Sequence, residues 1–186
     1  GLLGQMMEPV SFPDRSDVEL PEKPWATTGY KGDRPRNVIK SLELLPERLE
    51  AHNLKLQEKY ADIAATQKRS EEYLTDDAEI ILVAYGTVAR ICRSAIDMAR
   101  KKGIKAGLFR PITLWPFPDK TLASLADKER VFLTVEMSCG QMVEDVKLAI
   151  ECRRPVYFFS RVGGIVPSPE EVLAEIEKRV AGRCNA

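Results

Sequence analysis

Small, polar and basic residues follow the four main apolar segments of this chain, at the points where those segments end. They are Gly86 and Thr87, Arg110 with Thr113, Ser138 with Gln141, and Arg161 with Gly163 and Gly164. In an open α/β sheet, ligands collect outside the carboxyl ends of the strands, where helix N-termini present N–H groups to anions. These residues are therefore candidates for binding a carboxylate or an acidic neighbouring subunit. The alternative is that the caps serve only their own helices and that the two arginines pair locally.

The cysteines and the glycine at residue 86 give no support for four common kinds of cofactor site. Cys92, Cys139, Cys152 and Cys184 contain no Cys-x-x-Cys pair, so their spacing predicts neither a zinc site nor an iron–sulfur cluster. A thiol such as Cys139, at a predicted helix N-terminus, could have a lowered pKa. We interpret it instead as a small buried residue. One glycine at Gly86 falls short of Gly-x-Gly-x-x-Gly, so nicotinamide or flavin binding has no support.

The first of the apolar segments spans residues 80–85, with six non-polar or aromatic residues in a row. Such a run predicts a strand covered on both faces in a parallel sheet. After Gly86, apolar residues recur at a helical period until Gly103, which predicts an amphipathic helix ending there.

The same strand-then-helix pattern recurs downstream. Further strands are predicted at 104–109, 130–137 and 155–159. A short strand is predicted at 71–74, and the short turn after it permits only antiparallel pairing or a break in the sheet. Asp119 is expected to cap a short helix, Ser138 with Gln141 to form a capping box, and residues 168–171 to begin the last helix. The pattern predicts a three-layer α/β domain with a mainly parallel sheet.

The N-terminal part of the chain is organised differently. Residues 1–40 are rich in proline and carry Phe12, Trp25 and Tyr30, which favours an extended arm that docks on a neighbouring domain or subunit. Residues 41–70 carry one narrow apolar stripe on a charged helix. We favour a linker helix over a coiled coil, because polar residues interrupt the stripe. The expected divisions are thus 1–40, 41–70 and 71–186.

Composition limits the classes of function. Lysine and arginine total 28, as do aspartate and glutamate, so no net charge attracts nucleic acid or an anionic membrane. No apolar run is long enough to span a bilayer, and no signal peptide opens the chain. We expect a cytoplasmic protein. The chain begins at Gly1 in the middle of a pattern, which suggests a piece of a longer polypeptide.

Several motifs, in order along the chain, carry a resemblance to a known family. They are VAYGTVAR at 83–90, RPITLWPFP at 110–118 and EMS at 136–138 with GQM at 140–142. Together they resemble the C-terminal domain of the 2-oxoacid:ferredoxin oxidoreductases. GQMMEPV at 4–10, WATTG at 25–29 and RVGG at 161–164 are most similar to the 2-ketoisovalerate branch, in the subunit that carries the pyrimidine-binding domain.

The resemblance implies a transketolase C-terminal-like fold, whose five-stranded sheet has one antiparallel strand. It also implies a parent complex that oxidatively decarboxylates 2-oxoacids to acyl-coenzyme A, with thiamine diphosphate, magnesium and iron–sulfur clusters. Its partners would be thiamine-diphosphate-binding, gamma and ferredoxin-like subunits, with coenzyme A and ferredoxin as reactants. This piece is expected to hold none of the cofactors and not to catalyse the reaction alone.

Within that family, the candidate residues at the sheet edge become candidates for contacting coenzyme A or a partner subunit. The glutamate that serves the aminopyrimidine lies in a domain that the resemblance places before this chain, so Glu8 is interpreted as a linker residue. A second hypothesis, from another class, is a stand-alone anion-binding or assembly module without catalysis.

Overall fold

The computed structural model of this chain describes residues 11, 12, 14 and 19–182. The chain divides into two compact units, Gly1–Gln57 and Glu58–Ala186. Glu8, Cys184 and the motif at residues 4–10 lie outside the described residues.

The second unit is built on a five-stranded sheet with the strand order β1-β3-β2-β4-β5. Its strands are β1 (Ser70–Tyr73), β2 (Ile80–Val83), β3 (Ala106–Pro111), β4 (Val131–Glu136) and β5 (Val156–Ser160). β2 pairs in parallel with β3 and β4, and β4 pairs in parallel with β5. β1 pairs antiparallel with β3. The predicted sheet, mainly parallel with one antiparallel strand, is confirmed.

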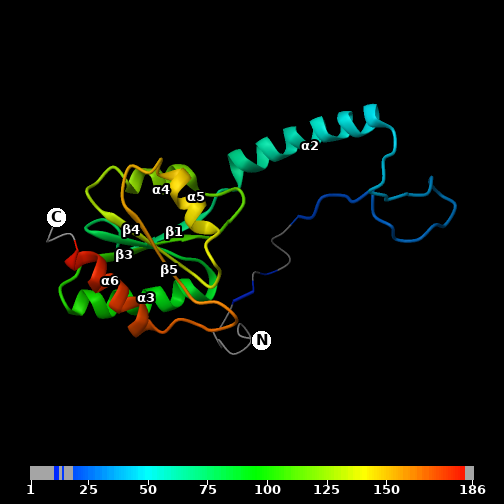
Figure 1. Ribbon diagram of the computed structural model, residues 1–186. Coiled ribbons are helices and arrows are strands. Elements are labelled where there is room, and N and C mark those ends of the chain that lie inside the picture. The colour runs from blue at the N-terminus through cyan, green and yellow to red at the C-terminus, as the bar shows by residue number, and fades with distance from the viewer. Residues whose placement is uncertain (1–10, 13, 15–18, 183–186) are drawn as a thin grey trace. The chain divides into compact units, whose positions relative to one another are not determined.

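Helices cover both faces of this sheet (Figure 1). α3 (Gly86–Lys101) and α6 (Pro169–Ala181) lie on one face, and α4 (Asp119–Leu125) and α5 (Met142–Ala149) on the other. Alternate residues of β2 serve the two layers, because successive side chains of a strand point to opposite faces. Ile80 and Leu82 pack in the core with α3 and α6, whereas Ile81 and Val83 pack in the core with α4 and α5. The predicted three-layer architecture and buried central strand are confirmed.

The apolar run at residues 80–85 is longer than the strand that it predicts. β2 ends at Val83, and Tyr85 is already exposed. The chain turns here to enter α3, whose first residue, Gly86, has a φ of +57°. A side chain at that position would be strained in this conformation, which accounts for the glycine.

Asp119 does not cap α4, contrary to the prediction. It is the first residue of the helix, and its N-cap residue Pro118 makes no side-chain capping bond. The Asp119 carboxylate instead accepts hydrogen bonds from Lys68 Nζ at 2.6 Å and from the Lys120 backbone at 2.7 Å. The bond from Lys68 lowers the pKa of the Asp119 carboxyl below its usual value. Lys68, which is distant in the sequence, therefore binds the carboxylate that the local pattern assigns to helix capping.

Gly107, in β3, allows a close approach of the chain that leaves β1. A Cβ at this position would lie 2.5 Å from the Leu74 carbonyl oxygen and 3.1 Å from Ala78 Cβ. The Leu74 oxygen is itself held by Arg100 Nη2 at 2.8 Å, so it has little freedom to move away. We therefore expect Gly107→Ala to lower the free energy of unfolding by about 1–3 kcal/mol through overpacking.

Urea unfolding of the purified chain measures this loss. Gly182→Ala is the matched control, because a Cβ there would meet only ordinary contacts at 3.5 Å or more. We expect that variant to stay within about 0.5 kcal/mol of the parent. Equal unfolding midpoints for the two variants would contradict the close-approach argument.

The first unit has a different character. Its described residues include no strand and no buried residue. α2 (Pro46–Thr66) begins in this unit and continues into the second. It is shorter than the predicted span of 41–70 and starts at a proline, which suits the first helical position because it lacks an N–H. No residue of α2 is buried, and no described helix is long and apolar enough to cross a membrane. The choice between linker helix and coiled coil stays a prediction.

Candidate functional site

Four loops leave the sheet where its parallel strands end, and they hold the residues that the sequence singles out. Gly86 and Thr87 follow β2, Arg110 and Thr113 lie at the end of β3, Ser138 and Gln141 follow β4, and Arg161, Gly163 and Gly164 follow β5. The parallel pairing of β3, β2, β4 and β5 places the four loops at one edge of the sheet. Hydrogen bonds decide which of these residues the structure brings together.

Glu136, which the sequence analysis did not single out, organises the loop after β4. Its side chain is buried, with 2% exposure. Its carboxylate accepts four hydrogen bonds, from Ser138 Oγ at 2.8 Å and from the backbone N–H groups of Gln141, Met142 and Val143 at 3.2, 3.2 and 2.9 Å. A carboxylate at this place also meets the positive end of the α5 dipole. The start of α5 is therefore held by an anion from within the chain.

The predicted capping box of Ser138 with Gln141 is wrong. Gln141 is the N-cap residue of α5, yet it makes no side-chain capping bond. Ser138 donates to Glu136 rather than accepting from the helix. An ionised carboxylate is a stronger acceptor than a hydroxyl, so it takes the free N–H groups. The groups that were expected to face an incoming anion already have an acceptor.

Glu136 also joins two of the four loops. The Arg161 backbone N–H donates to the Glu136 carbonyl oxygen at 3.1 Å. The Arg161 side chain turns to Glu171, with which Nη2 forms an ion pair. Glu171 belongs to the capping box of α6, where Ser168 Oγ accepts from the Glu171 N–H at 3.2 Å. The predicted helix start at residues 168–171 is confirmed, and Arg161 is tied to it.

The residues at the end of β3 form a separate group. Arg110 Nη1 lies 2.8 Å from Glu71 Oε2, and Arg93 Nη2 lies 3.0 Å from Glu71 Oε1. Thr113 Oγ1 accepts from the Arg69 N–H at 3.0 Å and donates to the Pro116 carbonyl oxygen at 3.0 Å. Arg110 and Thr113 thus fasten the β3 loop to the beginning of β1.

Both arginines of the edge are thus paired with nearby carboxylates, as the alternative of local pairing expects. They keep some capacity for a further partner. The Arg110 side chain is 42% exposed and that of Arg161 is 41% exposed. Arg161 Nε is buried and has no hydrogen-bond partner within the described chain, so any further partner must bind the exposed part of the guanidinium. An arginine has five N–H donors, so one ion pair leaves several available.

Three of the cysteines, Cys92, Cys139 and Cys152, lie within the described residues. Cys92 is buried in α3, and burial raises the pKa of its thiol. Cys139 and Cys152 are exposed. The expected burial of Cys139 is wrong, because α5 begins only at Met142 and leaves Cys139 in the loop. Among the residues that the structure describes, no three His, Cys, Asp or Glu side chains gather into a group that could hold a metal ion.

Comparison with known proteins decides the family. Residues 78–172, slightly more than half of the chain, match the family described as pyruvate:ferredoxin oxidoreductase core domain II. The chain belongs to this family. The matched span runs from Ala78, just before β2, to Val172 in α6, so it includes all four edge loops of this core domain II.

One relative extends the similarity beyond the core domain. The chain is 45% identical over 184 residues, or 99% of its length, to ketoisovalerate oxidoreductase subunit VorB of Methanothermobacter marburgensis. The aligned part is 51% of that relative. The chain therefore spans about half the length of the curated relatives that it matches most extensively.

Two solved structures share the fold of part of this chain. A 2-oxoglutarate:ferredoxin oxidoreductase from Magnetococcus marinus superposes with a TM-score of 0.59 at 16% identity, over 74% of this chain and 24% of that chain. A split-gene transketolase, described as an inactive beta4 tetramer, superposes with a TM-score of 0.51 at 20% identity, over 59% of this chain and 40% of that chain. The expected transketolase-like fold is thus confirmed.

Proposed function

We propose that this chain is the C-terminal part of a subunit of a 2-ketoisovalerate-type ferredoxin oxidoreductase. The parent complex oxidatively decarboxylates 2-oxoacids to acyl-coenzyme A with the help of thiamine diphosphate. The single observation that carries this proposal is the 45% identity to VorB over 99% of the chain. That identity does not favour the other hypothesis, a stand-alone anion-binding or assembly module.

In this proposal the domain at residues 71–186 shapes the rim of the active site and an interface between subunits. The residues for this role are those at the carboxyl edge of the sheet, from Gly86 and Thr87 to Gly163 and Gly164. The edge has support from the general placement of ligands in open α/β sheets. Arg110 and Arg161, each about two-fifths exposed, are the cations for a phosphate of coenzyme A or for a carboxylate of a partner subunit.

The remaining parts of the chain serve assembly. Residues 1–40 act as an arm, and residues 41–70 act as a helix that links the arm to the domain. The partners are the thiamine-diphosphate-binding, gamma and ferredoxin-like subunits. Thiamine diphosphate, magnesium and the iron–sulfur clusters belong to the parent complex. The described residues gather no set of metal ligands that fits them, so no chemical step is assigned through these cofactors to this chain.

Arginine substitutions in the assembled, full-length enzyme test the role of the edge. We expect Arg110→Ala and Arg161→Ala each to raise the KM for coenzyme A, or to weaken assembly of the subunits, by about tenfold. That is the loss expected for one charge-assisted hydrogen bond. Steady-state kinetics with 2-ketoisovalerate and native mass spectrometry are the two measurements.

Arg153→Ala is the matched control. Arg153 is also paired with a carboxylate, Asp127 at 2.7 Å, but it lies before β5, at the opposite edge of the sheet. We expect this variant to keep the parent KM and the parent assembly. An unchanged KM and unchanged assembly for all three variants would refute the proposed role of the sheet edge. A wild-type complex that does not oxidise 2-ketoisovalerate would instead refute the proposed substrate.

A further inference from the structure

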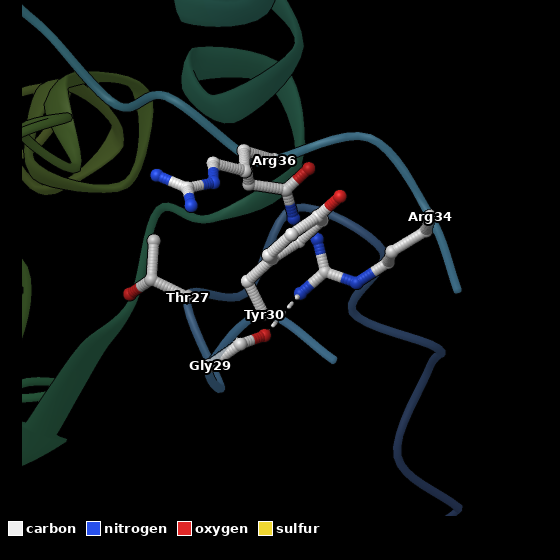
Figure 2. A pocket seen from close by; sticks show the side chains of 6 residues that line it. Thr27, Gly29, Tyr30, Arg34 and Arg36 are labelled. Carbon is white, nitrogen blue, oxygen red and sulfur yellow. Dashed lines mark hydrogen bonds between the residues drawn. The ribbon is translucent and has the colours of Figure 1, made fainter. Parts of the chain in front are cut away.

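A basic pocket lies in the first unit, outside the matched core domain. It has a volume of about 230 Å³ and is lined by Thr27, Gly29, Tyr30, Arg34, Arg36 and Asn37. Figure 2 shows Arg34 and Arg36 on either side of the Tyr30 ring. The pocket is formed by one short stretch of chain, so its shape depends on how that stretch folds back on itself.

Side chains hold this loop in place by binding its own carbonyl groups. Arg34 Nη2 donates to the Ala26 and Gly29 carbonyl oxygens, at 3.3 Å each. Asn37 Nδ2 donates to the Pro24 oxygen at 2.6 Å and to the Ala26 oxygen at 3.1 Å. Arg34 and Asn37 are therefore structural residues of the loop. Because their acceptors are neutral carbonyls, these bonds leave the positive charge of Arg34 uncompensated.

Arg36 contributes a second charge, which has no partner of opposite sign among the described residues. Its guanidinium carbon lies 4.7 Å from the centre of the Tyr30 ring, in a cation–π contact. Within the described part of the chain, neither Arg34 nor Arg36 forms an ion pair with a carboxylate. Residues 23–37 carry Lys23 and Lys31 as well, against Asp33 as the only acid. The pocket therefore favours a negatively charged group.

Exposed apolar side chains, close in the sequence to the residues that line the pocket, favour a negatively charged group that belongs to a protein. Trp25 is 63% exposed, Tyr30 53%, Val38 76% and Ile39 70%. No described residue of this unit is buried, so the loop has no core of its own. Exposed tryptophan, tyrosine and arginine together are the residue types that dominate the binding energy of protein interfaces. A free phosphate would compensate the charges but would leave these side chains in water.

We propose that this pocket binds an acidic side chain of a partner protein subunit. The aspartate or glutamate pairs with Arg36, whose guanidinium lies over the Tyr30 ring. Trp25, Val38 and Ile39 pack on apolar residues of the partner. The inference rests on the proposed function in one respect, since it takes the partner to be another subunit of the same complex. It assigns an assembly contact to residues 25–39, which lie outside the matched core domain.

Charge reversal at Arg36 tests the proposal in the full-length subunit with its native partners. Arg36 is the residue to change, because Arg34 holds the loop together. We expect Arg36→Glu to raise the Kd for the partner subunits at least about tenfold at low salt. The difference should shrink at about 1 M salt, where charges are screened. Arg36→Lys keeps the charge and should stay within about threefold of the parent.

Lys31→Glu is the matched control, because it makes the same charge change in the same loop without lining the pocket. We expect it to alter the Kd by less than about threefold. Equal effects of Lys31→Glu and Arg36→Glu, or no effect of either, would overturn the proposal. Saturable binding of inorganic phosphate that Arg36→Glu abolishes, with assembly unchanged, would also overturn it in favour of a small anion. Activity of the wild-type complex on 2-ketoisovalerate, measured separately, tests the proposed function instead.

Discussion

Replacing Glu136 by alanine is expected to lower the free energy of unfolding by about 3–5 kcal/mol. The carboxylate is buried and accepts four hydrogen bonds, three of them from backbone N–H groups at the start of α5. Alanine would leave these donors without their acceptor in a region from which water is largely excluded. Urea unfolding, followed by circular dichroism, measures the loss against a total stability of about 5–15 kcal/mol for a domain of this kind.

Two further variants separate the buried acceptor from the charge alone. Glu136→Gln keeps the shape, but its amide N–H₂ must face donors, so it should recover only part of the loss. Glu144→Gln removes the same charge from the first turn of α5 at an exposed position, and should cost about 0.3–1 kcal/mol. If all three variants lowered the free energy of unfolding by the same small amount, Glu136 would not be the residue that holds this loop in place.

The loop after β4 also explains why the candidate site was only partly predictable. A capping box is recognised from residues three apart, and Ser138 with Gln141 satisfies that local pattern. The pattern takes no account of an acceptor that lies earlier in the chain, at the end of a buried strand. Glu136 was the available signal, because it closes an otherwise apolar segment directly before the loop. The capping box at Ser168 was predicted correctly because both of its residues make the expected hydrogen bonds. The Glu171 carboxylate accepts from the Ser168 N–H at 2.9 Å.

The fold was more predictable than the site. An uninterrupted apolar run can be buried only between two covered faces, and β2 alone is sufficient to indicate a central strand. The short turn at residues 75–77 left antiparallel pairing or a break in the sheet open for β1, and only the family resemblance indicated the antiparallel strand. The turn leads to β2, whereas β1 pairs with β3. The partners of Arg110 and Asp119 were not predictable, because Glu71 and Lys68 come close to them only when β1 pairs with β3.

The arm differs from the domain because its sequence contains little periodicity to interpret. Prolines and exposed aromatic residues predict an extended, docking segment, and that remains a proposal. The particular fold of residues 24–37 depends on Arg34 and Asn37 binding main-chain carbonyls. No spacing rule announces such bonds, since any nearby carbonyl can accept them. The basic pocket was therefore recognised only from the structure.

Truncation of Phe132 tests the core that carries the edge loops. Phe132 lies in β4, is fully buried, and stands opposite Ile81 of β2 and Val156 of β5. It packs in the layer that contains α4 and α5. We expect Phe132→Ala to lower the free energy of unfolding by about 3–5 kcal/mol, because a large cavity would remain between the sheet and these helices.

Phe12→Ala is the matched control for this truncation. Phe12 is 88% exposed, so the same atoms are removed without opening a cavity. We expect a change within about 0.5 kcal/mol in urea unfolding of the same chain. For assembly of the complex we expect the opposite ranking of the two variants. Phe12 belongs to the arm that we propose to dock on a neighbour, whereas Phe132 acts within the domain. If Phe132→Ala lowered the free energy of unfolding by less than about 1 kcal/mol, the helices α4 and α5 would have moved to fill the cavity. The loop before α5 would then be more adaptable than the four hydrogen bonds of Glu136 indicate.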